Sequence, residues 1–263
     1  MVSYRYLCVL LFLFYSTLAY PQSEHLSFEH LGTAQGLSQS NVICTLQDSR
    51  GFMWFGTREG LNKYDGYTFT VYKNKIGDDK SLANNMINTI VEDDKGYLWI
   101  GTWGGGLDRY DRRTDQFVHY RHNPAAPGSL SSNLVLSLLR DTRGELWVGT
   151  EDGGLNRMDS TGRFEHFFHR PSDRQSLGDN FVKAICEDAD HQIWVGTGGG
   201  LCRLERKTGK FFRFLHDISN PASINNNAIS TLFVDSRRRL WIGTNSGLEL
   251  FDRRHPWHLH GSG

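Results

Sequence analysis

The sequence predicts an all-β fold in which a four-stranded antiparallel unit of about 45 residues is repeated five times. The first observation behind this prediction is a Trp-x-Gly-Thr motif that recurs every 45 to 48 residues, with its tryptophans at Trp54, Trp99, Trp147, Trp194 and Trp241. The second is an aspartate six residues before each tryptophan, at Asp48, Asp93, Asp141, Asp188 and Asp235. The third is that Gly, Asn, Asp and Ser interrupt the apolar runs too often for helices of ordinary length.

The first 19 residues are unlike the rest of the chain and predict a secretory signal peptide. Arg5 precedes an apolar stretch from Leu7 to Leu18, and Ala19 ends a small-residue cleavage site. The apolar stretch is short for a bilayer span, so cleavage after Ala19 is favoured over retention as a membrane anchor. We therefore expect an exported protein.

Each unit contains four short strand-like segments, which are clearest in the third copy. Residues 133–141 (NLVLSLLRD) form a nearly continuous apolar run, typical of a strand covered on both faces. Asp141 to Gly144 then has the chemistry of a tight turn, in which the Asp side chain accepts hydrogen bonds from backbone amides and Gly has a positive φ. Residues 145–150, 154–159 and 162–168 are expected to be the second, third and fourth strands.

Other repeated features mark the unit boundaries. A Gly-Leu pair follows each Gly-Thr after a short loop, and Ser-Leu-x-x-Asn or a close variant opens the second to fifth units. We place a signal peptide at 1–19 and propeller repeats at 25–252, with blade units at about 40–80, 81–128, 129–175, 176–222 and 223–252. Four antiparallel strands in a unit of this length, repeated along the chain, are the sequence signature of a β-propeller.

A β-propeller explains the regular tryptophans. Its blades pack face to face around an axis, so each second strand can present a large ring at the same height toward the neighbouring blade. The Gly after the Trp leaves room where backbones approach closely. We therefore assign a structural role to Trp54, Trp99, Trp147, Trp194 and Trp241.

The two ends of the repeat region leave the closure of the propeller open. Residues 25–31 (HLSFEHL) have the spacing of a fourth strand, while the fifth unit lacks one. This segment could therefore complete the last blade and close a five-bladed ring, or the five units could form an arc of a larger propeller. Residues 253–263 do not continue the repeat, and we expect a disordered tail in preference to an adventitious metal site at His255, His258 and His260.

Composition argues against several functions. The 29 basic and 29 acidic side chains cancel, so no overall field attracts nucleic acid or a membrane surface. Cys44, Cys186 and Cys202 lie in apolar, strand-like runs, and we expect small buried side chains rather than metal ligands. The glycine-rich segments lack a strand-to-helix context for phosphate binding, and no cofactor or metal is expected.

The segment GLSQSNVICTLQDSRGFMWFGTREGLNKYDGYTFTVYKN, residues 36–74, resembles the two-component regulator propeller repeat. The resemblance runs from about Phe28 to Asp252 and repeats five times. It implies the periplasmic sensor region of a hybrid two-component system of Bacteroidetes, which perceives glycan fragments and signals to a cytoplasmic histidine kinase. Family members usually carry more repeats and further domains, so we interpret the chain as the N-terminal portion of such a sensor.

Functional residues are expected where the repeat varies. In a propeller, the loops between the second and third strands lie around the axis on one face, together with the connections to the next blade. On these loops we expect an oligosaccharide to contact Trp103, Arg58, Glu59, Glu151, Asp152 and Asn245. Trp103 is a large aromatic in a glycine loop, suited to stacking on a sugar ring, but plugging the channel or packing on a neighbouring loop is an equal alternative.

Two other function classes remain open at this point. A secreted propeller glycosidase or lyase could use paired carboxylates such as Glu151 and Asp152, although adjacent acids in a short loop more often face solvent. The polar loop residues show no single arrangement of acid, base and orienting group, so we expect no catalytic residues. A weaker alternative is a scaffold that binds another protein, such as a second sensor chain.

Overall fold

The structure, a computed structural model, describes residues 27–251. The chain divides into two units, Met1–Leu31 and Gly32–Gly263. Residues 27–31 of the first unit contain no strand or helix, and the rest of the expected closing strand lies outside the described residues. The expected signal peptide and the tail at 253–263 lie outside them as well, so these assignments and the closing strand stay predictions.

The second unit is built from five antiparallel sheets, as the sequence predicts. Four sheets have four strands each, and the last sheet has three within the described residues. In chain order the sheets are β1(Val42–Gln47), β2(Met53–Thr57), β3(Gly60–Tyr64), β4(Phe69–Tyr72); β5(Ile87–Glu92), β6(Leu98–Thr102), β7(Leu107–Asp111), β8(Gln116–Tyr120); β9(Val135–Arg140), β10(Leu146–Thr150), β11(Leu155–Met158), β12(Phe164–Phe167); β13(Val182–Glu187), β14(Ile193–Thr197), β15(Gly200–Glu205), β16(Lys210–Phe214); and β17(Ile229–Val234), β18(Leu240–Thr244), β19(Gly247–Phe251). A 3₁₀ turn at Thr33–Gln35 precedes β1.

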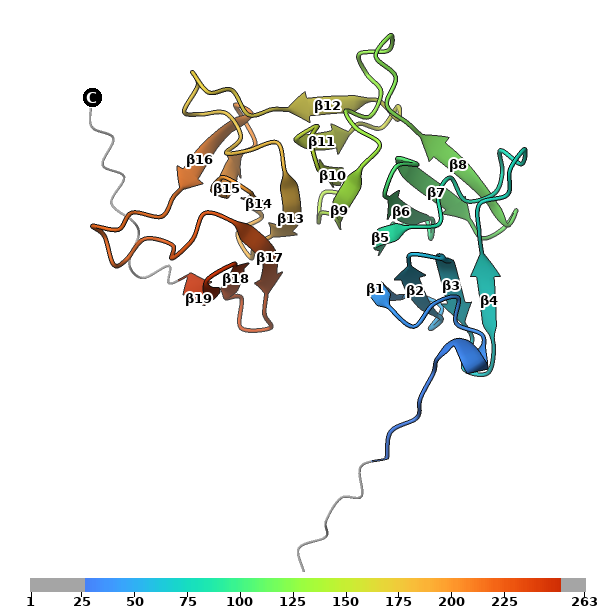
Figure 1. Ribbon diagram of the computed structural model, residues 1–263. Helices are drawn as coiled ribbons and strands as arrows, with labels where there is room; N and C mark the ends of the chain where they lie inside the picture. Colours follow the sequence, from blue (N-terminus) through green and yellow to red (C-terminus); the bar gives the residue numbers. More distant parts are fainter. Residues whose placement is uncertain (1–26, 252–263) are drawn as a thin grey trace, which may run out of the picture. The chain divides into compact units, whose positions relative to one another are not determined.

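Within this second unit the sheets stand side by side in an arc (Figure 1). The first strands, β1, β5, β9, β13 and β17, follow one another along its inner side, and β4, β8, β12 and β16 lie on its outer side. Each sheet pairs its strands in simple sequential order. This is the arrangement of propeller blades, and the all-β propeller prediction is confirmed.

The turn between the first two strands of each sheet is set by the repeated Asp. Asp141 Oδ1 accepts hydrogen bonds from the backbone amides of Arg143 and Glu145, at 3.0 and 2.8 Å. Gly144 in this turn has a φ of 78°, and His191 and Arg238 take the same left-handed conformation in the last two sheets, with φ of 60° and 65°. The expected turn chemistry is therefore confirmed, and it persists where the Gly is lost.

The Gly of the Trp-x-Gly-Thr motif marks close contact between neighbouring sheets in the first four sheets. A Cβ atom on Gly101, Gly149 or Gly196 would lie 2.5 to 2.6 Å from a Val or Ile side chain of the next first strand. For Gly149 the side chain is that of Val182, which is fully buried. A larger residue here would push the sheets apart, so the Gly is required by packing between blades rather than by its own φ.

The core is divided among the interfaces between sheets rather than lying within single sheets. Trp54 of the first sheet packs with Tyr110 and Ile87 of the second, and Trp194 of the fourth packs with Phe251 of the fifth. Trp54, Trp147 and Trp194 are each 1% exposed or less. The packing role predicted for the motif tryptophans is therefore present, although Trp241 of the last sheet is only half-buried.

The three cysteines in the described residues are free thiols in these interfaces. Burial raises the pKa of Cys44, Cys186 and Cys202 to about 12. A thiol with such a pKa is neither a good nucleophile nor a ready metal ligand at neutral pH. No group of three or more His, Cys, Asp or Glu side chains between residues 27 and 251 is placed to hold a metal ion.

The last sheet is less covered than the internal ones. Phe233, Leu248 and Leu250 are 62%, 66% and 44% exposed.

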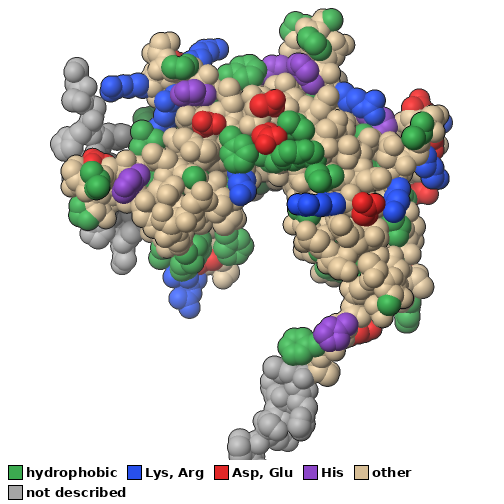
Figure 2. Space-filling model, in the orientation of Figure 1, with side chains coloured by type: hydrophobic (Ala, Val, Ile, Leu, Met, Phe, Trp, Pro, Cys, Tyr) green, Lys and Arg blue, Asp and Glu red, His purple; other side chains and the backbone are tan. Residues whose placement is uncertain are grey.

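On the visible face of the molecule, charged side chains of both signs are interspersed (Figure 2). In the described part of the chain, no helix is long and apolar enough to cross a membrane.

Candidate functional site

The loops between the second and third strands have the same construction in every sheet. The motif Thr donates its hydroxyl to the carbonyl of the Gly beyond the loop, as in Thr102 to Gly106 and Thr150 to Gly154, both at 2.9 Å. These Thr side chains are buried. The repeated residues therefore hold the ends of each loop, and the side chains between them are left to vary.

These loops lie beside the connections that lead to the next sheet. The amides of Gly104 and Gly106 donate to the carbonyl of Asn133, at 2.9 and 3.0 Å, and the amide of Gly154 donates to Asn180 at 3.0 Å. Both Asn residues belong to the Ser-Leu-x-x-Asn motif. The expectation that the two kinds of loop share one edge of the sheets is met here.

The Ser-Leu-x-x-Asn motif fastens each of these connections. In the second such connection, Asn133 Oδ1 accepts the His122 amide at 2.8 Å and Ser129 Oγ accepts the Asn123 amide at 2.9 Å. Leu130 between them is fully buried. The motif is therefore structural, a role that the sequence reasoning did not specify.

Trp103 lies on the loop of the second sheet with its side chain 37% exposed. Its amide donates to the Met86 carbonyl at 3.0 Å, and it forms an isolated antiparallel bridge with Leu134. The backbone is thus held on both sides while about a third of the residue faces solvent. Trp103 thus differs from the motif tryptophans of the first four sheets, which lie in the cores between sheets.

The other expected ligand contacts occupy equivalent loops. Arg58, Glu59, Asp152 and Asn245 are exposed, and Glu151 is half-buried. The amides of Glu151 and Asn245 are held by the preceding connections, at Leu134 and Ala228, and Glu59 lies 4.0 Å from Lys73. The cavity between the second and third sheets, described below, includes none of these residues, so their role in ligand binding stays a prediction.

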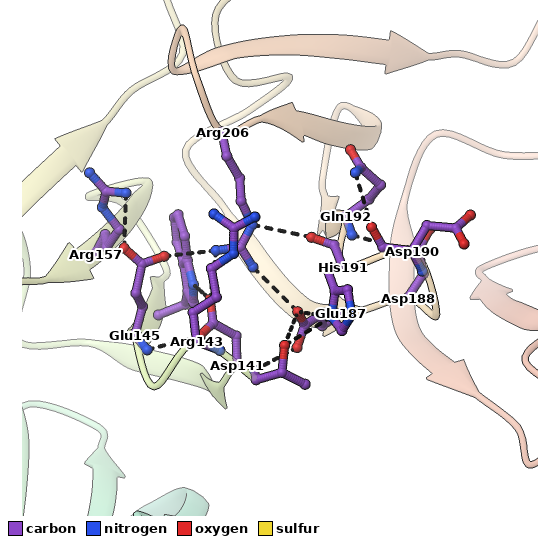
Figure 3. A network of polar contacts seen from close by, with 12 residues as sticks. Asp141, Arg143, Glu145, Arg157, Glu187, Asp188, Asp190, His191, Gln192 and Arg206 are labelled. Atoms are coloured by element: carbon purple, nitrogen blue, oxygen red, sulfur yellow. Dashed lines mark hydrogen bonds and ion pairs between the residues drawn. The ribbon is translucent and has the colours of Figure 1, made fainter.

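The opposite edge of the sheets carries buried ion pairs that the sequence reasoning missed. Arg206, after β15, reaches the turn of the preceding sheet, with Nη1 2.8 Å from Asp141 and 2.7 Å from Glu145 (Figure 3). Its Nη2 lies 3.6 Å from Glu187 of its own sheet. Glu187 also accepts hydrogen bonds from the amide and hydroxyl of Thr142, both at 2.7 Å.

The same bridge joins the first and second sheets. Arg112 lies 2.9 Å from Asp48 and 2.7 Å from Glu92, while Glu92 accepts two hydrogen bonds from Ser49. The side chain of Arg112 is 7% exposed and that of Arg206 is 9% exposed. The signal in the sequence is an Arg five residues after the Leu of Gly-Leu, together with a Glu at the end of the first strand.

These carboxylates are held in their charged form. Burial would raise the pKa of Asp141, but hydrogen bonds from the Trp147 indole and a backbone amide, together with Arg206, outweigh it and lower the pKa. For Glu92, hydrogen bonds from Ser49 and Arg112 likewise outweigh burial, and its pKa is lowered. The bridges therefore persist at neutral pH and are part of the packing between blades.

A buried His–Asp pair lies inside the second sheet. His119 Nδ1 is 2.6 Å from Asp108 Oδ1, and Nε2 is 2.7 Å from the Asp79 carbonyl. Because the carbonyl can only accept, Nε2 carries a proton. The Asp108 carboxylate raises the pKa of His119 by hydrogen bonding to its protonated ring. Asp108 also accepts the Ala83 amide at 2.7 Å, so the pair holds a connection and has a structural explanation.

Five segments match the two component regulator propeller family model, at residues 36–59, 81–104, 129–152, 176–199 and 223–246. The chain contains five two-component regulator propeller repeats. Each matched segment includes the first two strands of a sheet and the Trp-x-Gly-Thr motif. The family resemblance seen in the sequence is therefore confirmed.

Two relatives of this propeller protein belong to signalling systems. The extracellular domain of a hybrid two component system from B. thetaiotaomicron is 32% identical, with a TM-score of 0.75, and the match covers 86% of this chain and 30% of that one. Histidine kinase P4 of Formosa agariphila is 43% identical over 75 residues, which is 28% of this chain and 6% of the kinase. The propeller chain thus spans less than a third of either relative.

Other solved structures share the fold alone. Virginiamycin B lyase from Staphylococcus aureus is 16% identical with a TM-score of 0.55, and the match covers 80% of this chain and 69% of the lyase. At this identity the likeness shows a propeller and nothing about activity.

Proposed function

We propose that this chain is the ligand-sensing part of a two-component signalling protein, located in the periplasm after export. The observation that carries the proposal is its similarity to the extracellular domain of a hybrid two component system over 86% of the chain. The match to a histidine kinase supports a kinase as the receiver of the signal. The neutral overall charge also gives no reason to expect a polyanionic nucleic acid as the ligand.

The ligand we propose is an oligosaccharide bound at the loops between second and third strands. Trp103 supports this because its indole is exposed on a backbone that is held by hydrogen bonds on both sides. A sugar ring can stack on such a surface, and the exposed Arg58, Asp152 and Asn245 on equivalent loops can hydrogen-bond hydroxyls. One stacking contact is modest, so binding should require several loops.

The test is a calorimetric screen of polysaccharide digests against the chain and its Trp103→Ala variant. We expect binding of a glycan fragment that weakens by about tenfold or more in Trp103→Ala. Tyr67→Ala is the matched control, because Tyr67 is 92% exposed on the hairpin between third and fourth strands. Equal weakening in both variants would contradict a site on the loops.

The same mixtures distinguish a sensor from an enzyme. We propose that the chain binds without changing its ligand, so chromatography of the digests after incubation should show unchanged glycans. New products would support the alternative of a glycosidase or lyase. Absence of binding to every digest would favour a protein-binding scaffold, for example one that associates with a second sensor chain.

A further inference from the structure

A cavity of about 620 Å³ lies between the second and third sheets. Its walls come from the turn and third strand of the second sheet and from the two hairpins of the third sheet, and include Tyr97, Arg109, Arg140, Gly144 and Ser160. These hairpins are at the edge opposite the loops that carry Trp103. The cavity is therefore separate from the proposed oligosaccharide site, and the inference does not depend on that proposal.

The cavity is located where an inter-sheet bridge is missing. The repeat position held by Arg112 and Arg206 in the bridged interfaces is Ser160 in the third sheet. The position held by Glu92 and Glu187 is Arg140. Ser160 is too short to fill the space that the arginine fills in the bridged interfaces. Arg140 places a positive charge where those interfaces have a negative one.

The walls of the cavity are rich in cations. Five cationic side chains line it, against three acidic ones. The Arg109 guanidinium lies over the Tyr97 ring, 4.5 Å from its centroid, and within residues 27–251 neither Arg109 nor Arg143 has an ion pair within 4.0 Å. Arg140 has one long pair, 3.4 Å to Asp94, whose side chain is 83% exposed.

Two of these arginines are also short of hydrogen bonds. Four buried side-chain nitrogens in the described residues lack a partner, and two of them are Arg109 Nε and Arg140 Nε. The other two belong to Arg112 and Arg206, whose guanidinium groups are already bridged by carboxylates. Because these Nε atoms are enclosed by protein, an anion would reach the two guanidinium groups at their terminal Nη atoms, which have no carboxylate partner in Arg109 and one long one in Arg140.

We propose that this cavity binds a small organic anion, a carboxylate carried on a six-membered ring. Guanidinium groups pair with a carboxylate in a planar, two-bonded geometry, which accounts for the charge. The volume is within the usual range for small-molecule sites and exceeds that needed by an inorganic anion. Tyr97, Tyr120 and Met158 in the walls supply apolar surface for the ring.

The binding experiment uses two acids with matched neutral partners. Glucuronate is compared with glucose, and benzoate with benzyl alcohol, by calorimetry and by thermal shift of the full chain at low salt. We expect at least one acid to bind about tenfold or more tightly than its neutral partner. Preferred binding of glucuronate would identify a sugar acid as the ligand class, and preferred binding of benzoate would identify an aromatic acid. If neither acid is preferred up to about 50 mM, the proposal is wrong.

Variants locate the binding. The Arg109→Gln variant should bind the acid about tenfold more weakly. Ser160→Arg combined with Arg140→Glu should abolish binding, because it rebuilds the bridge of the other interfaces in the cavity. This double variant should melt at or above the temperature of the unaltered chain, which separates loss of the site from misfolding.

Two controls complete the design. Arg170→Gln removes one exposed positive charge from a connection outside the cavity, and Trp103→Ala alters the loop site. Both should leave acid binding unchanged. Retained binding in the double variant, or an equal loss in Arg170→Gln, would overturn the assignment.

Discussion

At the scale of single residues, the repeat is built on an Asp–Trp pair. The indole Nε1 of every motif Trp donates to the Oδ2 of the Asp six residues before it, at 2.7 Å in Trp54 and Trp194 and 2.9 Å in Trp99, Trp147 and Trp241. The other oxygen of the same carboxylate holds the turn. One Asp thus couples the turn to the core, since a buried indole N–H needs an acceptor.

The Trp147→Ala variant should lose about 3 to 5 kcal/mol of unfolding free energy. Trp147 is fully buried, and its removal leaves a cavity between the third and fourth sheets and takes the indole donor from Asp141. Trp103→Ala should change the unfolding free energy by less than about 1 kcal/mol, because that ring is 37% exposed. Urea unfolding of both variants measures the difference, and equal losses would contradict the division into core and loop tryptophans.

At the scale of elements, two devices join neighbouring sheets. At one edge of the strands, a Gly lets the next first strand approach closely. At the other edge, Arg112 and Arg206 bridge carboxylates of two sheets, whereas the interface between the second and third sheets has Ser160 at this position. The interfaces are therefore alike in apolar packing and different in charge, and the difference leaves a cavity in one of them.

The Arg206→Met variant should destabilise the chain by about 3 kcal/mol or more. Met keeps much of the volume but leaves Asp141 and Glu187, whose side chains are 0% and 8% exposed, without their shared cation. Ser160→Ala at the equivalent position should change stability by about 0.5 kcal/mol or less. Thermal and urea melts of the two variants measure the change in unfolding free energy. An unchanged unfolding free energy in Arg206→Met would mean that the bridge adds no net stability.

At the scale of the molecule, five similar sheets pack in series, each contributing to a core shared with the next. The last sheet has no such cover on Phe233 and Leu248 in the described residues. The repeat residues account for folding, and the loops and the interface between the second and third sheets are left for variation. The proposed periplasmic sensor would have to be exported, and the first 19 residues predict export.

Expressed with its own leader, the protein should be recovered from the periplasm as a chain that begins at Tyr20. Arg5, the apolar stretch and Ala19 form the expected signal, and export separates the propeller from the reducing cytoplasm. Mass spectrometry of the purified periplasmic protein measures its first residue. An Ala19→Arg variant should be cleaved poorly. Intact Met1 on soluble protein in the cytoplasm would contradict the prediction.

The strands, the turns, the order of the units and the burial of four of the five motif tryptophans could be predicted from the amino-acid sequence. They could be predicted because each depends on local chemistry repeated five times, as in the Asp turn that persists at His191 without Gly. The sequence also indicated that Trp103 differs from the motif tryptophans. Which charges meet could not be predicted in this way, because Arg206 and Asp141 are 65 positions apart and belong to different sheets. The cavity beside Ser160 arises from the same cause, since a missing side chain becomes a site only when the neighbouring sheet supplies the opposite wall.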